Sequence, residues 1–144
     1  MDIEMNNRGF KFNIRTQFSF ITNDHILSCI LSDIAEKKIN INGYSQTKIN
    51  LNENMVRLVV GSTSSETDSD LLEVGNILKT FDVRFKKKRI IQIPTVSGIP
   101  GQINAIFGAL WCKLNVKALY YGEDSLLYLD VSNLDKALKI LSKE

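Results

Sequence analysis

The chain has 144 residues, of which 44% are hydrophobic and 24% are charged, and its formal net charge is +2. The hydrophobic share is sufficient for a folded core and argues against an intrinsically disordered chain. The small net charge argues against a general nucleic-acid binder, because binding to the phosphate backbone needs a dense basic surface. No apolar run approaches the ~20 residues that span a bilayer, so we expect a cytoplasmic protein without a membrane partner.

Both cysteines, Cys29 and Cys112, fall inside apolar helical patterns. The chain has no C-x-x-C pair, which excludes a dithiol redox motif and a zinc knuckle. We therefore expect buried and reduced thiols, which are typical of an intracellular protein. We expect neither a bound metal nor a cofactor.

The first half of the chain predicts a strand, a helix, two strands and a second helix. Apolar and polar side chains alternate over residues 10–20, which is the period of a strand with one solvated face. Residues 26–35 carry apolar side chains at helical spacing. Strands are predicted within 39–51 and 55–60, and the apolar positions of 71–81 predict the second helix.

The same order of elements begins again in the second half. The predicted strands and helices of this second pass are 89–96, 103–114, 115–121, 126–131 and 132–141. Trp111 lies on the apolar stripe of the first of these helices, so we expect it in the core. No strand follows the last helix, so the second unit lacks one strand. A sequence that reads twice in this way predicts a tandem of small modules.

Two turns lie at equivalent places, between the first strand and the first helix of each half. The first contains Asn23 and Asp24, and the second consists of Ser97, Gly98, Ile99, Pro100 and Gly101. The start of a helix offers unpaired N–H groups, and glycine lets a ligand approach the backbone closely. A carboxylate, such as that of a free amino acid, suits this geometry. The alternative is that the glycines only permit a tight turn and the polar side chains only cap a helix.

Other polar residues give weaker indications of function. His25 beside Asp24 could form an acid–base pair, but a capping or surface role is the alternative we favour. The basic cluster of Arg84 and residues 86–89 predicts a solvated strand edge, because alternate side chains of a strand point in opposite directions. Phosphate binding is the alternative. No nucleophile, metalloprotease or phosphate-loop motif occurs, so we predict no catalytic residues and no enzyme.

Three segments of the second half resemble the ACT domain family. "VSGIPGQINAIFGAL" is similar to the strand, Pro-Gly turn and first helix of that family, "KLNVKALYYG" to its helix-to-strand passage, and "LYLDVSNLDKALKIL" to its closing strand and helix. In the first half, "ITNDHILSCILSDIAEKKINING" resembles the helix and the strand after it. There, Asn23 and Asp24 stand where a Pro-Gly pair is usual.

The resemblance implies an α+β fold, with ferredoxin-like βαββαβ units in tandem and helices on one face of an antiparallel sheet. The first module would span 10–88 and the second, truncated module 89–144, after an N-terminal extension of 1–9. The ligand of such domains meets the first strand-to-helix turn, which marks the two turns described above. The second unit would leave the strand at 89–96 with an open edge. We favour the N-terminal segment over another subunit as its cover.

The resemblance also implies a function. Such a protein binds a small molecule, often an amino acid, and regulates without catalytic activity of its own. It would act through a regulated enzyme or another protein partner, or through its own oligomer, with a homodimer as the expected state. The alternative is a structural or protein-interaction module of the same fold that has lost its ligand.

Overall fold

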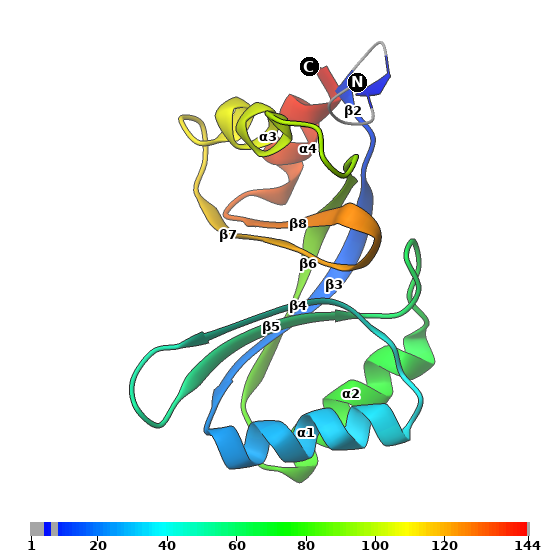
Figure 1. Cartoon of the computed structure of the whole chain (residues 1–144), viewed down its shortest axis with the longest axis vertical. Coiled ribbons are helices and arrows are strands. Elements are labelled where there is room, and N and C mark those ends of the chain that lie inside the picture. Colours follow the sequence, from blue (N-terminus) through cyan, green and yellow to red (C-terminus); the bar gives the residue numbers. More distant parts are fainter. Residues whose placement is uncertain (1–4, 7–8, 144) are drawn as a thin grey trace. The chain divides into compact units, whose positions relative to one another are not determined.

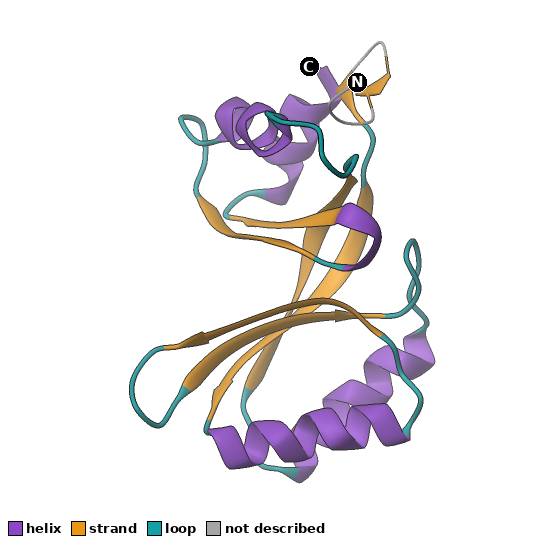
Figure 2. Cartoon of the chain, in the orientation of Figure 1, coloured by secondary structure: helices purple, strands orange, loops and turns teal. Residues whose placement is uncertain are grey.

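The computed structural model describes residues 5–6 and 9–143, and these form an α+β fold with four helices (Figures 1 and 2). The elements in chain order are β1 Met5–Asn6, β2 Gly9–Phe10, β3 Asn13–Thr22, α1 Asp24–Glu36, β4 Ile41–Lys48, β5 Asn54–Val60, α2 Asp68–Thr80, β6 Phe85–Pro94, α3 Gln102–Leu110, β7 Val116–Tyr121, β8 Leu126–Val131 and α4 Leu134–Lys143. The predicted repetition of strand, helix, two strands and helix is therefore present.

The chain divides into two compact units. One is Thr16–Lys88, and the other combines Met1–Arg15 with Arg89–Glu144. Strands β3 and β6 contribute residues to both units. Residues 10–15, which the sequence analysis grouped with the first module, thus belong to the same unit as the second half of the chain.

The Thr16–Lys88 unit has the strand order β4-β5-β3-β6, and β5 pairs antiparallel with both β4 and β3. Helices α1 and α2 lie together on one face of these strands (Figure 1). The core between the helices and the strands includes the fully buried Phe18, Ile30, Leu58, Val74 and Leu78. Phe18 and Phe20 on β3 are turned toward the core, as alternation predicted, but the opposite face is not solvated as expected, because Arg15 and Gln17 are each only 1% exposed.

The other unit has the strand order β3-β6-β8-β7, with β8 antiparallel to both β6 and β7. Helices α3 and α4 cover one face of β6, β7 and β8 (Figure 1). Its core includes the fully buried Ile91, Ile106, Leu110, Leu129 and Leu141.

The N-terminal segment lies beside β6 in this unit, as predicted. The first residues of β3 neighbour β6, and the amide of Asn13 donates a hydrogen bond to Gln92 Oε1 at 3.1 Å. Phe10 is 6% exposed and packs in the same core as Ile91 and Ile93. The first residues of β3 thus lie along the edge of β6 that the sequence analysis expected to be open.

Three of the four described α-helices have a side-chain cap at their N-terminus. The side chains of Asn23, Thr67 and Asn133 each accept a hydrogen bond from the N–H group three residues on, at 2.8, 3.1 and 3.0 Å. Such a cap stabilises a helix by ~1 kcal/mol. Helix α3 differs, because its N-cap is Gly101 in a left-handed conformation, with no side-chain cap.

Two further expectations about burial are wrong. Trp111 is 61% exposed, and Ile103 and Phe107 on the same side of α3 are each 43% exposed. Helix α3 carries apolar residues at several faces, and the core takes the stripe of Ile106 and Leu110 instead. The cysteines are free thiols, but Cys112 is exposed and the other is only partly buried.

Candidate functional site

The turn between β6 and α3 is held by side-chain contacts at both of its ends. At the first end, the N–H and hydroxyl groups of Thr95 both donate to the carbonyl oxygen of Ser125, just before β8. At the other end, Gly101 adopts φ +90°, a conformation that favours glycine and lets the chain enter α3 directly. The residues between these points, Ser97 to Pro100, form the exposed part of the turn.

Gln102, the first residue of α3, clamps this turn from the inside. Its Oε1 accepts a hydrogen bond from the N–H of Val96 at 2.7 Å, and its Nε2 donates to the carbonyl of the same residue at 2.6 Å. The Nε2 group also donates to the carbonyl of Ile99 at 2.9 Å. The side chain is only 6% exposed, so these bonds satisfy an amide that is out of contact with water. The amide thus binds the turn as a neighbouring strand would.

A pocket of about 380 Å³ opens beside the clamped turn. Three of the five residues predicted in the second turn line it, namely Ser97, Gly98 and Ile99, whereas Pro100 and Gly101 do not. The opposite wall comes from the end of β7 and the turn after it, with Tyr121 and Ser125. Its volume lies within the ~300–1,000 Å³ that is typical of small-molecule sites.

The pocket offers polar groups but no charged side chain among its lining residues. The backbone N–H groups of Ser97 and Gly98 make no hydrogen bond within the part of the chain that the structure describes. Gly98 has φ +82°, and a Cβ added there would meet nothing within 4 Å. A small ligand with a carboxylate can therefore approach this backbone from the open side and accept hydrogen bonds from it.

The turn before α1 is built differently. Asn23 uses its side chain to cap α1, and Asp24 accepts hydrogen bonds from Lys48 Nζ at 2.5 Å and from Asn54 Nδ2 at 2.7 Å. The hydrogen bond from Lys48 has the larger effect and that from Asn54 the smaller, and together they lower the pKa of the Asp24 carboxyl below its usual value. The predicted polar pair is present in one turn, but both side chains already have partners in the protein.

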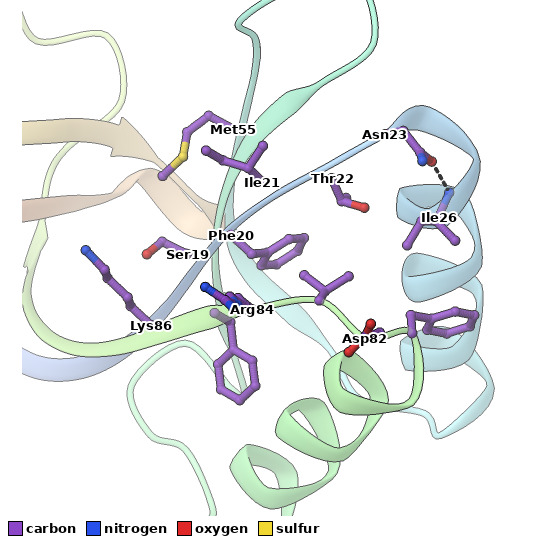
Figure 3. Close-up of a pocket in the computed structure, with 13 residues that line it drawn as sticks. Ser19, Phe20, Ile21, Thr22, Asn23, Ile26, Met55, Asp82, Arg84 and Lys86 are labelled. Atoms are coloured by element: carbon purple, nitrogen blue, oxygen red, sulfur yellow. Dashed lines mark hydrogen bonds between the residues drawn. The ribbon is translucent and has the colours of Figure 1, made fainter.

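A larger hollow, of about 860 Å³, lies in the same unit (Figure 3). It is formed by the end of β3, the start of α1 and residues 81–86, which lead into β6. Asn23 is the only predicted site residue that lines it, and Asp24 does not. Arg84 and Lys86, two members of the basic cluster, both line this hollow, which the sequence analysis missed. We call this hollow the β3–β6 groove.

The structure gives no indication of catalytic chemistry at His25. The side chain is exposed, and within the described residues it makes no hydrogen bond or ion pair. Residues 5–6 and 9–143 contain no cluster of three or more potential metal-binding side chains. None of the helices in these residues combines the length and apolar character needed to cross a membrane.

Comparison with known proteins places the chain in a class by its fold. No protein-family model and no curated protein matches this sequence. Solved structures do match, and the fold is that of ACT-type regulatory proteins, which confirms the resemblance seen in the sequence.

The particular neighbours include two regulatory subunits of aspartate kinase. The subunit from Thermus thermophilus, in a ligand-free form, has a TM-score of 0.64 and 14% identity, with 92% of each chain covered. The subunit from Thermus flavus has a TM-score of 0.65 and 13% identity over 98% of this chain and 95% of that one. A protein from Bacteroides thetaiotaomicron has a TM-score of 0.70 and 18% identity, over 90% of this chain and 88% of that one. At these identities the likeness is one of fold.

Proposed function

We propose that this protein is a regulatory module that binds a free amino acid or a similar small metabolite, with no catalytic activity of its own. We further propose that it is built from two ferredoxin-like units in tandem. The strand orders β4-β5-β3-β6 and β3-β6-β8-β7 support this architecture, because each puts the two strands that precede the helices of its unit in the middle.

The clamped turn before α3 is the observation that carries the proposal. The side-chain amide of Gln102 is fully hydrogen-bonded to the backbone of Val96 and Ile99, which fixes the turn. The N–H groups of Ser97 and Gly98 in this turn have no acceptor among the described residues. The start of α3 adds uncapped N–H groups and a partial positive charge. A carboxylate bound there gains hydrogen bonds that the fold itself does not use.

Regulation requires a second component, because a ligand can shift only an equilibrium whose two states bind it differently. Two of the solved neighbours are regulatory subunits of an enzyme, aspartate kinase. By analogy, we propose that this protein acts on a separate enzyme or other protein partner in the cytoplasm, either directly or as a homodimer whose formation depends on ligand.

The proposal can be tested by measuring thermal shifts of the full chain with each of the protein amino acids. Any amino acid that gives a shift is then titrated by calorimetry. A ligand at 100 times its Kd stabilises the folded state by ~2.7 kcal/mol, which is a shift of several degrees. Gln102→Leu should weaken binding because it releases the turn. Asn104→Ala is the matched control, since Asn104 is exposed on the same helix and does not line the pocket. No shift with any amino acid would contradict the proposal.

A specific observation favours one alternative, a protein-interaction module without ligand. Ile103, Phe107 and Trp111 lie four residues apart and form an exposed apolar stripe on α3. If this stripe is the functional surface, amino acids cause no thermal shift. Trp111→Ser would then change the molar mass measured by light scattering, or abolish the binding of a partner protein. A ligand response that is unchanged in Trp111→Ser would favour the regulatory module.

A further inference from the structure

The β3–β6 groove concentrates charged side chains along one of its sides. From residue 82 to residue 86 exposed and partly buried side chains alternate: Asp82, Arg84 and Lys86 are exposed. Val83 and Phe85 between them pack on the core of the unit, although both also line the groove. Figure 3 shows Lys86, Arg84 and Asp82 following one another along this segment beside β3. All three line the groove, so alternation has brought two cations and one anion to the same surface.

These charges have no partners among the residues that the structure describes. Neither Arg84 nor Lys86 forms an ion pair or a side-chain hydrogen bond with another described residue, and the same holds for Asp82. By contrast, Asp24 and Lys48 of the same unit bind each other at 2.5 Å. The cations of the groove are therefore available to an external anion, and a guanidinium can bind a carboxylate with two hydrogen bonds.

The rest of the groove offers both polar and apolar surface to a ligand. Its other side carries the short polar side chains of Ser19, Thr22 and Asn23, and apolar surface comes from Ile21 and Met55. Ile21 and Met55 are directly opposite each other in the β3–β5 register, and Ile21 is 47% exposed. A ligand that fits has two anionic groups for the two cations, one cationic group for Asp82, and a short aliphatic chain between them.

We infer that the β3–β6 groove binds an acidic amino acid, whose two carboxylates pair with Arg84 and Lys86 and whose ammonium pairs with Asp82. This site lies wholly in the Thr16–Lys88 unit and is separate from the turn pocket of the proposed function. A phosphate or a nucleic acid fits less well. The groove has no glycine among its lining residues to present backbone N–H groups, and it carries a carboxylate that repels polyanions.

Titration calorimetry of the full chain with L-glutamate and L-aspartate tests this inference, with L-glutamine, L-asparagine and inorganic phosphate as comparison ligands. We expect binding of at least one acidic amino acid and at least tenfold weaker binding of its neutral amide, because one charge-assisted pair is lost. Equal binding of inorganic phosphate, or no heat with either acidic amino acid, would overturn the inference.

Variants locate the binding. Arg84→Gln and Lys86→Gln should each weaken it by about tenfold or more, since each removes one cation from an exposed position where folding is little affected. Lys87→Gln removes the same charge from the adjacent exposed residue, which does not line the groove, and should leave affinity within about twofold. If Lys87→Gln weakens binding as much as Arg84→Gln, the effect is one of overall charge and the inference fails.

Asp82→Asn separates an amino acid from a plain dicarboxylate. Asp82 has φ +57°, a conformation that asparagine tolerates, so the backbone is not strained by the change. We expect weaker binding of the acidic amino acid and unchanged or tighter binding of succinate, which has no ammonium. Gln102→Leu, which opens the turn pocket, should leave both affinities unchanged. Loss of binding in Gln102→Leu with none in Arg84→Gln would place the ligand in the turn pocket and overturn the inference.

Discussion

The clamp formed by Gln102 makes a sharp prediction for Gln102→Glu. The substitution keeps the size of the side chain and one oxygen opposite the N–H of Val96. It replaces the Nε2 donor with a second oxygen, which then faces the carbonyl oxygens of Val96 and Ile99, now bonded at 2.6 and 2.9 Å. At neutral pH, two hydrogen bonds are lost and a negative charge enters a place where the side chain is only 6% exposed.

The expected cost follows from these two changes. Each hydrogen bond contributes ~1 kcal/mol net, and desolvation of the charge adds to the loss of two bonds, so we expect a decrease of at least ~2 kcal/mol in the free energy of unfolding at pH 7. Protonation of the new carboxyl restores a donor to the two carbonyls. The fold therefore raises the pKa of this carboxyl above its unfolded value. The loss in free energy of unfolding relative to wild type is therefore small at acidic pH. It grows as the pH rises from the pKa of this carboxyl in the unfolded chain to its higher pKa in the folded protein.

Urea unfolding at about pH 7 and pH 4 measures this deficit directly. Asn104→Asp serves as the control, because it adds the same charge to the same helix at an exposed position whose side chain has no hydrogen bond to another described residue. A Gln102→Glu protein within about 0.5 kcal/mol of wild type at pH 7 would refute the clamp. A deficit of the same size at both values of pH would refute the role of the carbonyls.

Three other regions give predictions of their own. The Lys48 ammonium lowers the pKa of Asp24, so the contact stabilises the fold above the unfolded pKa and is lost as the pH falls through the folded one. Asp24→Asn should flatten this loss in urea unfolding followed from about pH 5 to pH 2, and an identical pH dependence would mean that the contact does not persist in solution. Phe10→Ala should lower the free energy of unfolding by ~3–5 kcal/mol, since Phe10 fills the core beside β6, whereas Lys11→Ala should cost less than ~1 kcal/mol. A small effect of Phe10→Ala would show that the N-terminal segment is not part of that core. Trp111 is the only tryptophan and is 61% exposed, so acrylamide should quench the fluorescence of the folded protein almost as strongly as that of the unfolded chain. Shielded fluorescence would indicate that α3 is covered by a second molecule.

The order of the elements could be predicted because it depends on local patterns. The strand period along residues 10–20 and the capping side chain of Asn23 act over a few residues, and the structure contains both the strand and the cap. The burial of Arg15 and Gln17 on the face expected to be solvated could not be predicted from the period alone. The placement of the N-terminal segment beside β6 was also predictable, because an unpaired strand edge has to be covered. These features follow from general rules of hydrogen bonding and burial rather than from details of packing.

The details of the sites depended on side-chain contacts that the sequence does not specify. Gln102 occupies a position at helical spacing from Ile106, so a polar residue on the buried stripe was the available signal for the clamp. Trp111 and Ile106 belong to neighbouring stripes of one apolar helix, and only packing decides which stripe meets the core. The basic cluster was interpreted as divided between two faces, which is correct for adjacent residues. That interpretation overlooked that Arg84 and Lys86 share a face.

The two strand-to-helix turns have equivalent positions in the chain but different chemistry. In the first, the side chain of Asn23 already satisfies a helix N–H group, and the Asp24 carboxylate is bound to Lys48. In the second, Gly101 provides no side-chain cap, so the N–H groups at the start of α3 have no such partner. A ligand carboxylate at the second turn would therefore make hydrogen bonds that the protein lacks, whereas at the first it would have to displace bonds that exist. In the Thr16–Lys88 unit, Arg84 and Lys86 line the β3–β6 groove outside this turn, and they are the cations to which we assign an anionic ligand.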